Sequence, residues 1–458
     1  MTGAGIPSAL LRRERAQRAV DRLAAEIERW LAGWSERPEQ TSQLARLGKT
    51  LRALLRLLQQ RADAIVPATG FAEARAVDAD LAVIERVWRH YADRLDQRRD
   101  PRLAPTLRAA DDVIWACTTA ARDLVGAGAS AVMPLPLAYV EPAYSPTAIP
   151  RSKPPADLQS SELAFARILA FLPVPLIGLP TSVVDEPWWL VLIAHEVGHH
   201  VQYDLEPSAA LLDRTADLLK AAGGAEGSTW LRWREEVFAD AFAIATCGPA
   251  ALLATIELEW GELDAMLALR GAYPPVLIRL ALMSALASKL KLGGALALDD
   301  LLPALADAPR ALARTRLAAA TTAAAALAAM PIGAKDLTAL AQTVRGPDDG
   351  FLDQALAGVP LDLDPARLQP LRAVAAGFRA YRALVRVIDD KQREKQRTVL
   401  RVQLTPLIAQ LRAPRDVLRD GTIDLAPSDD EIAALVGDVG ALLPARTGAP
   451  PVVIEVAR

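Results

Sequence analysis

The chain has 458 residues, of which 52% are hydrophobic and 23% are charged, and its formal net charge is −3. This length exceeds what one ordinary core holds, so we expect several domains. The near-neutral charge, with no long run of one sign, argues against nucleic acid or an anionic membrane as the partner. Leu, Ala, Arg, Glu and Asp outnumber the β-branched and aromatic residues typical of strands. A mainly α-helical protein follows.

Residues 1–126 predict four amphipathic helices. Their apolar residues recur with the i, i+3, i+4, i+7 spacing of one helix face, and breakers such as SERPEQ and VPATG separate the runs. Short loops favour antiparallel neighbours, so we expect an N-terminal helical bundle over residues 1–126. His90 lies off the apolar stripe of its helix, and we expect it at the surface.

Residues 127–160 are rich in proline, which excludes a helix and predicts an extended segment. The segment is either a plain linker or a cover for the site that follows it. Residues 161–290 form the next predicted domain, which contains the apolar run VPLIGLP (174–180). Prolines bound this run on both sides, which predicts a short strand at the edge of a sheet. Residues 291–458 are rich in Ala and Leu and predict a C-terminal helical domain.

Three of the four histidines of the chain lie within the apolar stretch WWLVLIAHEVGHHVQY, residues 188–203. This stretch contains the pattern HExxH. Residues i and i+4 of a helix share a face, so His195 and His199 can grip one ion, and Glu196 can reach a water on it. Burying imidazoles without partners is costly, and a metal ion removes that cost. His200 points about 100° away from His199, so we expect it either to support a metal ligand from outside the ligand set or to have a packing role.

A zinc site of this kind requires a third protein ligand. A third histidine is excluded, because Gln202 and Leu205 stand where that class of site has Gly and His. The downstream helix TWLRWREEVFADAFAIATCG (229–248) offers two adjacent glutamates. Glu236 flanks the apolar stripe of this helix, whereas Glu235 points nearly opposite it and is expected to be solvated. We therefore predict that His195, His199 and Glu236 bind Zn²⁺.

Asp240 lies one turn beyond Glu236 and also flanks the apolar stripe. A carboxylate there is placed to hold a metal-ligating histidine through its other ring nitrogen. An exposed acidic pair on a surface helix is the alternative interpretation of this region. It accounts for Glu235, but it accounts poorly for an aspartate between Ala239 and Ala241.

HExxH followed by EVFADAFA resembles the gluzincin metallopeptidases, in particular the HtpX and CAAX-prenyl-protease group. Their signature is HExxH, then a glutamate ligand with an aspartate four residues later in an E-x-x-A-D context. Members also carry His-Pro and an arginine six residues after that histidine. In GAYPPVLIRLALM, Tyr273 takes the place of the histidine and Arg279 follows six residues later. The resemblance implies that Tyr273 and Arg279 face the zinc-bound carbonyl. It extends from VPLIGLP to Arg279, and the chain departs from the membrane-embedded members in lacking predicted spans.

These patterns together predict a mainly α protein with a zincin-like α+β metallopeptidase core, a small edge-strand sheet and flanking helical domains. We expect a soluble, cytoplasmic zinc endopeptidase with Glu196 as general base and with Tyr273, Arg279 or both as oxyanion donors. The alternative for the last two residues is a helix that starts at Pro-Pro and carries a surface arginine. A protein or peptide substrate is expected to pair with the VPLIGLP edge. One alternative is a helical interaction protein with a structural or inactive zinc site, and another is a peptidase held latent by its flanks. The helical flanks are also the candidate surface for a regulatory protein.

Overall fold

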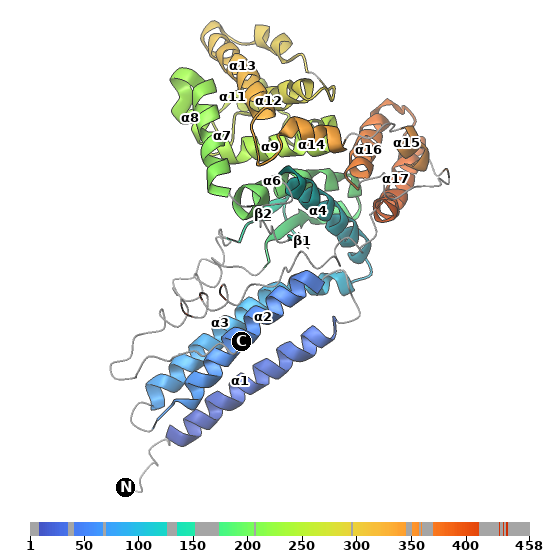
Figure 1. Cartoon of the computed structure of the whole chain (residues 1–458). Helices are drawn as coiled ribbons and strands as arrows, with labels where there is room; N and C mark the ends of the chain where they lie inside the picture. The colour runs from blue at the N-terminus through green and yellow to red at the C-terminus, as the bar shows by residue number, and fades with distance from the viewer. Residues whose placement is uncertain are drawn as a thin grey trace. The chain divides into compact units, whose positions relative to one another are not determined.

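The computed structural model describes residues 9–34, 41–66, 70–125, 135–151, 174–205, 208–294, 296–344, 350–356, 359 and 370–411, with the single positions 430, 434 and 437. The chain divides into two compact units. Unit 1 comprises Met1–Asp96, Ile149–Pro175 and Gly421–Arg458, and unit 2 comprises Gln97–Ala148 and Leu176–Asp420. The described part is mainly helical with one small sheet, as the composition predicts (Figure 1).

Unit 1 contains three long helices, α1 (Ala9–Ala32), α2 (Thr41–Asp63) and α3 (Gly70–Asp96), which pack on one another. Their apolar stripes form the core, as their spacing predicts. The prediction for His90 is wrong, because its side chain is buried against the ring of Tyr91. Burial, helped by the charge of Arg94, lowers the pKa of His90 to about 3. A helix that contacts two neighbours is covered over a wider arc than its apolar stripe.

The fourth predicted helix, α4 (Ala104–Val125), forms as expected but belongs to unit 2. One hydrophobic core runs through unit 2 from Leu107 to Leu411. The contacts therefore divide the chain differently from the sequence analysis, which drew boundaries after residues 126 and 290. The helices after residue 291 share the core of the preceding ones, because α13 packs on α12, α14 and α16 pack on α9, and α17 packs on α4.

The sheet has three strands, β1 (Leu137–Glu141), β2 (Thr147–Ile149) and β3 (Leu176–Pro180), in the order β1-β3-β2. Strands β1 and β3 are parallel, with Leu137 opposite Leu176 and Glu141 opposite Pro180. The VPLIGLP run is thus the central strand, and its prediction as an edge strand is wrong. Its prolines lie at or before the strand ends, where they leave the central pairing intact.

Part of the Pro-rich segment supplies the two flanking strands. Strands β1 and β2 lie between its prolines, so this part is neither a plain linker nor a loose cover. Gly178 of β3 leaves room for a hydrogen bond, 3.0 Å long, that Thr147 of β2 donates to Glu141 of β1. Residues 127–134 and 152–160, the remainder of the predicted cover, lie outside the described residues.

The remaining α-helices of unit 2 are α6 (Ile193–Asp204), α7 (Ser208–Gly223), α8 (Gly227–Leu231), α9 (Arg234–Cys247), α10 (Pro249–Glu259), α11 (Leu263–Leu267), α12 (Val276–Lys289), α13 (Asp307–Ala328), α14 (Leu337–Val344), α15 (Gly350–Leu356), α16 (Pro370–Ala383) and α17 (Asp390–Gln410). Short 3₁₀ helices are η2 (Gln97–Arg99), η4 (Thr181–Val184), η5 (Pro187–Leu192), η6 (Gly224–Glu226), η7 (Leu298–Ala304) and η9 (Leu384–Arg386). Within the described residues, every helix is too short or too polar to cross a membrane.

Helix α6 is held on two sides. His200 Nε2 lies 3.2 Å from the carbonyl oxygen of Leu176 in β3, so this histidine ties the helix to the sheet, in keeping with its expected packing role. On another side α6 packs against α9, and a Cβ atom at Gly198 would lie only 2.7 Å from Cα of Ala239 (Figure 1). Glycine at this position allows the two backbones to approach closely. The approach places the side chains of α6 and α9 within reach of one another.

Candidate metal centre

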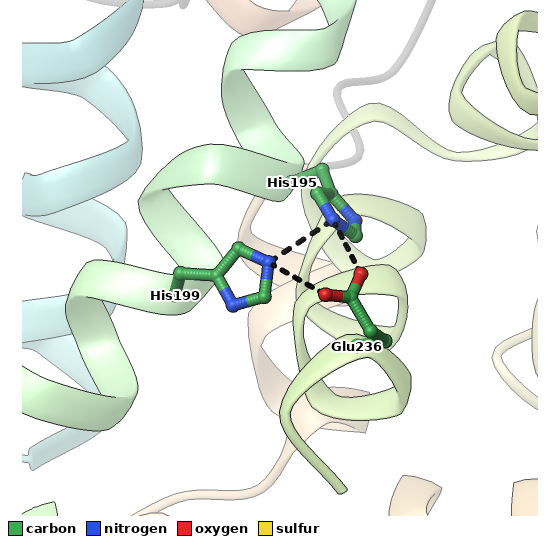
Figure 2. A group of neighbouring side chains, drawn as sticks. All are labelled: His195, His199 and Glu236. Atoms are coloured by element: carbon green, nitrogen blue, oxygen red, sulfur yellow. Dashed lines mark hydrogen bonds and ion pairs between the residues drawn. The ribbon is translucent and has the colours of Figure 1, made fainter. Parts of the chain in front are cut away.

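Two helices bring three metal-ligating side chains together. His195 and His199 project from α6, one turn apart, and Glu236 projects from the first turn of α9 toward them (Figure 2). Their ligand atoms all lie within 4.8 Å of one another. The side chains of both histidines are 14% exposed and that of Glu236 is 10% exposed, so the group is mostly shielded from water. The structure therefore contains a group that could hold a metal ion.

The spacing of these atoms fits a small ion with four ligands. Four ligands placed tetrahedrally about 2.0–2.1 Å from one ion are about 3.3–3.4 Å apart. The Nε2 atoms of His195 and His199 are 3.2 Å apart. Glu236 lies 3.3 Å from Nε2 of His195 through Oε2 and 3.7 Å from Nε2 of His199 through Oε1. Glu236 Oε2 is buried, and a metal ion held between it and the two Nε2 atoms would give all three atoms a partner.

The two adjacent glutamates of α9 lie in different surroundings. Glu236 is 8% exposed and joins the histidines. Glu235 interacts with the hydroxyl of Tyr203 instead, and this contact contributes to the raised pKa of Tyr203 after the larger effect of burial. The backbone carbonyl of Glu235 also accepts a hydrogen bond from Gln202 Nε2 at 2.8 Å. The structure thus places Glu236 at the centre, as the helix-face argument predicts, whereas Glu235 is more enclosed than expected.

A chain of ionic contacts begins at Nδ1 of His195, the ring nitrogen that faces away from His199 and Glu236. This nitrogen lies 2.8 Å from Oδ1 of Asp240, which is 1% exposed, so Asp240 makes the contact with His195 that the sequence predicts. Arg279 of α12 grips both oxygens of Asp240, with Nε–Oδ2 and Nη2–Oδ1 distances of 2.7 Å. The third guanidinium nitrogen, Nη1, pairs with Glu259 of α10. Burial alone would raise the pKa of Asp240, but the charges of Arg279 and His195 hold it well below its usual range.

The role expected for Arg279 does not agree with these contacts. All three of its nitrogens are paired with carboxylates, and the side chain is 8% exposed. Three of its five N–H donors are thereby engaged, and they hold the guanidinium between Asp240 and Glu259. Arg279 therefore positions Asp240, and through it His195. The sequence pattern located the residue correctly but did not reveal that two carboxylates enclose it.

Tyr273 does approach the metal-ligating group. Glu236 is the largest influence on its pKa, which is raised also by burial and by Glu196. Its side chain is 43% exposed, so the phenol stands at the open side of the centre. A tight turn presents it: the Tyr273 N–H donates to the carbonyl of Arg270 at 3.3 Å, and Gly271 within the turn has φ +69°. Glycine accepts this left-handed conformation without strain.

Glu196 is 7% exposed and follows the first histidine directly. Burial raises its pKa above the ordinary value, against the opposing effect of His195. For His195, the carboxylates of Asp240 and Glu236 and the charge of Glu196 outweigh burial and raise the pKa to about 10. Burial and the charge of His195 lower the pKa of His199 to about 3. A metal ion held here would compete with a proton for His195, because only the neutral imidazole binds a metal.

Two contributors escaped the sequence analysis. Gly198 was read only as a variable position of HExxH, although a glycine inside a helix is a signal for close helix packing. Glu259 carries no local motif, and it reaches Arg279 only because α10 and α12 fold against each other. No protein-family model, curated protein or solved structure matches this chain. The chemistry of the centre therefore rests on its own geometry.

Proposed function

We propose that this chain is a zinc-dependent peptidase with a zincin-like core, and that His195, His199 and Glu236 hold the metal. The observation that carries the proposal is the tetrahedral spacing of two imidazoles and one carboxylate beside the buried Glu196 and the phenol of Tyr273. Imidazole nitrogens favour zinc over calcium or magnesium, which take oxygen ligands. When bound, zinc would polarise the carbonyl of the scissile peptide bond and lower the pKa of a bound water to near neutrality.

The residues of the chain supply the remaining chemistry. Glu196 accepts the proton of the attacking water and passes it to the leaving amine, a task suited to a carboxylate whose pKa burial raises. Tyr273 donates a hydrogen bond to the oxyanion from the open side of the site. Asp240, held by Arg279, fixes the ring of His195 so that Nε2 faces the metal.

A structural zinc site would be closed by a fourth protein ligand. Among the described residues the metal-ligating group has three members, and His200 is directed to the carbonyl of Leu176 instead. This arrangement favours a catalytic site over the interaction protein considered from the sequence. The expected pairing of substrate with β3 is withdrawn, because β1 and β2 occupy both of its edges.

The test compares the wild-type chain with Glu196→Gln. Glutamine has the shape of glutamate but accepts no proton, and Glu196 is not among the metal ligands. We expect the variant to keep one zinc per chain and an unchanged melting temperature, and to lose cleavage of denatured casein by at least about a hundredfold. Zinc is measured by elemental analysis of the purified protein. Undiminished cleavage by zinc-loaded Glu196→Gln would refute the role of Glu196, and no cleavage by zinc-loaded wild type would refute the peptidase.

A further inference from the structure

A cavity of about 540 Å³ lies beside the metal centre, within unit 2. Leu258, Met266 and Val276 form its apolar wall. Tyr273 belongs both to this cavity and to the surroundings of Glu236, so the two spaces adjoin at its side chain. A cavity of this size accommodates a peptide side chain with its backbone. Its position next to the phenol makes it a candidate subsite for the substrate.

Arg270 lines the cavity and keeps unused hydrogen-bonding capacity. Its Nη1 donates to Oε2 of Glu259 at 2.6 Å. Its Nε and Nη2 make no hydrogen bond to a described residue, and the side chain is 43% exposed. Arg279, in contrast, uses all three nitrogens. A guanidinium has five N–H donors arranged to receive a carboxylate.

The carboxylate that pairs with Arg270, Glu259, also lines the cavity and is shared with a second guanidinium group. Glu259 lies between two guanidinium groups and gives Oε1 to Arg279 and Oε2 to Arg270. Its single negative charge is therefore shared by two cations, while Asp240 serves Arg279 and His195. An incoming carboxylate would meet the unused N–H donors of Arg270 at the cavity, and a charge-assisted hydrogen bond would form there.

The same turn fixes Arg270 and Tyr273 relative to each other. The two residues pair through their backbones, and the guanidinium carbon of Arg270 lies 5.9 Å from the centre of the Tyr273 ring. An anion bound by Arg270 therefore lies next to the proposed oxyanion donor. An extended peptide advances about 3.3 Å per residue, so the selected residue would lie within a few positions of the bond to be cleaved.

We propose that the cavity is a specificity subsite and that Arg270 selects a residue bearing a carboxylate. The carboxylate is that of an acidic side chain or of a C-terminal residue, and the apolar wall receives the aliphatic part of the same residue. The inference rests on the proposed peptidase function, whose substrate class it defines.

Binding tests the subsite independently of catalysis. Zinc-loaded Glu196→Gln is titrated with the dye-labelled, amidated peptide Ala-Phe-Ala-Glu-Ala-Phe-Ala-Glu-Ala. Two matched probes carry Gln in place of Glu, one amidated and one with a free C-terminal acid. We expect one carboxylate probe to bind about tenfold more tightly than the amidated Gln probe, since a charge-assisted hydrogen bond is lost in the latter. Tighter binding of the Glu probe identifies the side chain as the source, and tighter binding of the free acid identifies the C-terminus.

Introducing Arg270→Gln into this variant should abolish the preference, and Arg270→Lys should keep part of it because the charge remains. Arg386→Gln, at an exposed position of η9, is the matched control and should change nothing. Equal binding of all three probes, or equal weakening of all three by Arg270→Gln, overturns the proposal. Sites of casein cleavage by the wild type separate the two ideas. Cleavage at sites without a nearby carboxylate would refute the subsite and support the peptidase function. Carboxylate-dependent binding without any cleavage would support the subsite and refute the peptidase function.

Discussion

Asp240 is the residue on which the order of the metal-ligating group depends. It is buried, and it lies between His195 and the guanidinium of Arg279. A buried carboxylate is stable only with partners, and here both of its oxygens are engaged. Most side chains of α9 are buried, so a change at one of its polar positions removes specific contacts and not solvent-exposed surface. Substitutions at adjacent residues of α9 should therefore differ sharply in their effect on zinc binding.

Glu236 and Glu235 provide the sharpest comparison of this kind. We expect Glu236→Gln to reduce zinc content after dialysis to below about a tenth of the wild-type value, because a neutral amide replaces a charged ligand. Glu235→Gln should leave zinc content unchanged, since Glu235 contacts Tyr203 and not the histidines. Zinc is quantified by elemental analysis of dialysed protein. Loss of metal from the Glu235→Gln variant alone would mean that Glu235, and not Glu236, is the third ligand.

At the scale of elements, the site depends on how closely two helices approach. Helices α6 and α9 carry the three ligands, and the contact of Gly198 with Ala239 brings their backbones together. Sheet and helix are joined on another side by His200 and Leu176. The HExxH pattern accounts for one helix of the site, but the distance to the second helix depends on the absence of a side chain at Gly198.

Gly198→Ala tests this dependence. The added Cβ would meet Cα of Ala239 at 2.7 Å and its carbonyl oxygen at 3.1 Å, and backbone atoms cannot move aside as a flexible side chain can. We expect a loss of about 1–3 kcal/mol in the free energy of unfolding and a fall in zinc affinity of at least about tenfold as the helices separate. Urea denaturation and competition with a chromophoric chelator measure the two effects.

Gly261→Ala is the matched control, because a Cβ atom there has no heavy atom within 4 Å. Its zinc affinity and stability should equal those of the wild type. A Gly198→Ala protein with unaltered zinc affinity would mean that the separation of α6 and α9 does not control the ligand geometry.

At the scale of the whole molecule, the C-terminal helices are part of the unit that carries the metal-ligating group. The ring of Tyr381 in α16 stacks on Trp188 with centroids 4.7 Å apart, and Phe378 meets the edge of Trp189 at 5.2 Å. Both tryptophans lie in η5, which leads directly into α6. The expectation of an independent domain after residue 291 therefore fails for the described helices, because their aromatic side chains complete the packing behind the histidines.

Phe378→Ala should therefore destabilise the metal centre and α16 in a single transition. Phe378 is fully buried, so its truncation is expected to cost about 3–5 kcal/mol of unfolding free energy. Val385→Ala, at a site 80% exposed, should change stability by less than about 0.5 kcal/mol. Tryptophan fluorescence and zinc release are followed during urea unfolding. Two separate transitions, with zinc release unaffected by Phe378→Ala, would instead indicate an independent C-terminal domain.

The sequence by itself determined that the protein is mainly helical and that His195, His199 and Glu236 meet at the candidate metal centre. Helical periodicity is a local property, so the spacing of His195 and His199 and the face of Glu236 could be predicted without tertiary information. The tertiary structure decided what depends on contacts distant in the chain: that β3 is central, that α4 and α16 share one core with α6, and that Arg279 is enclosed by Asp240 and Glu259. Strand order, core membership and ion pairing depend on which surfaces pack together. A local sequence pattern does not identify the distant segment that packs against it.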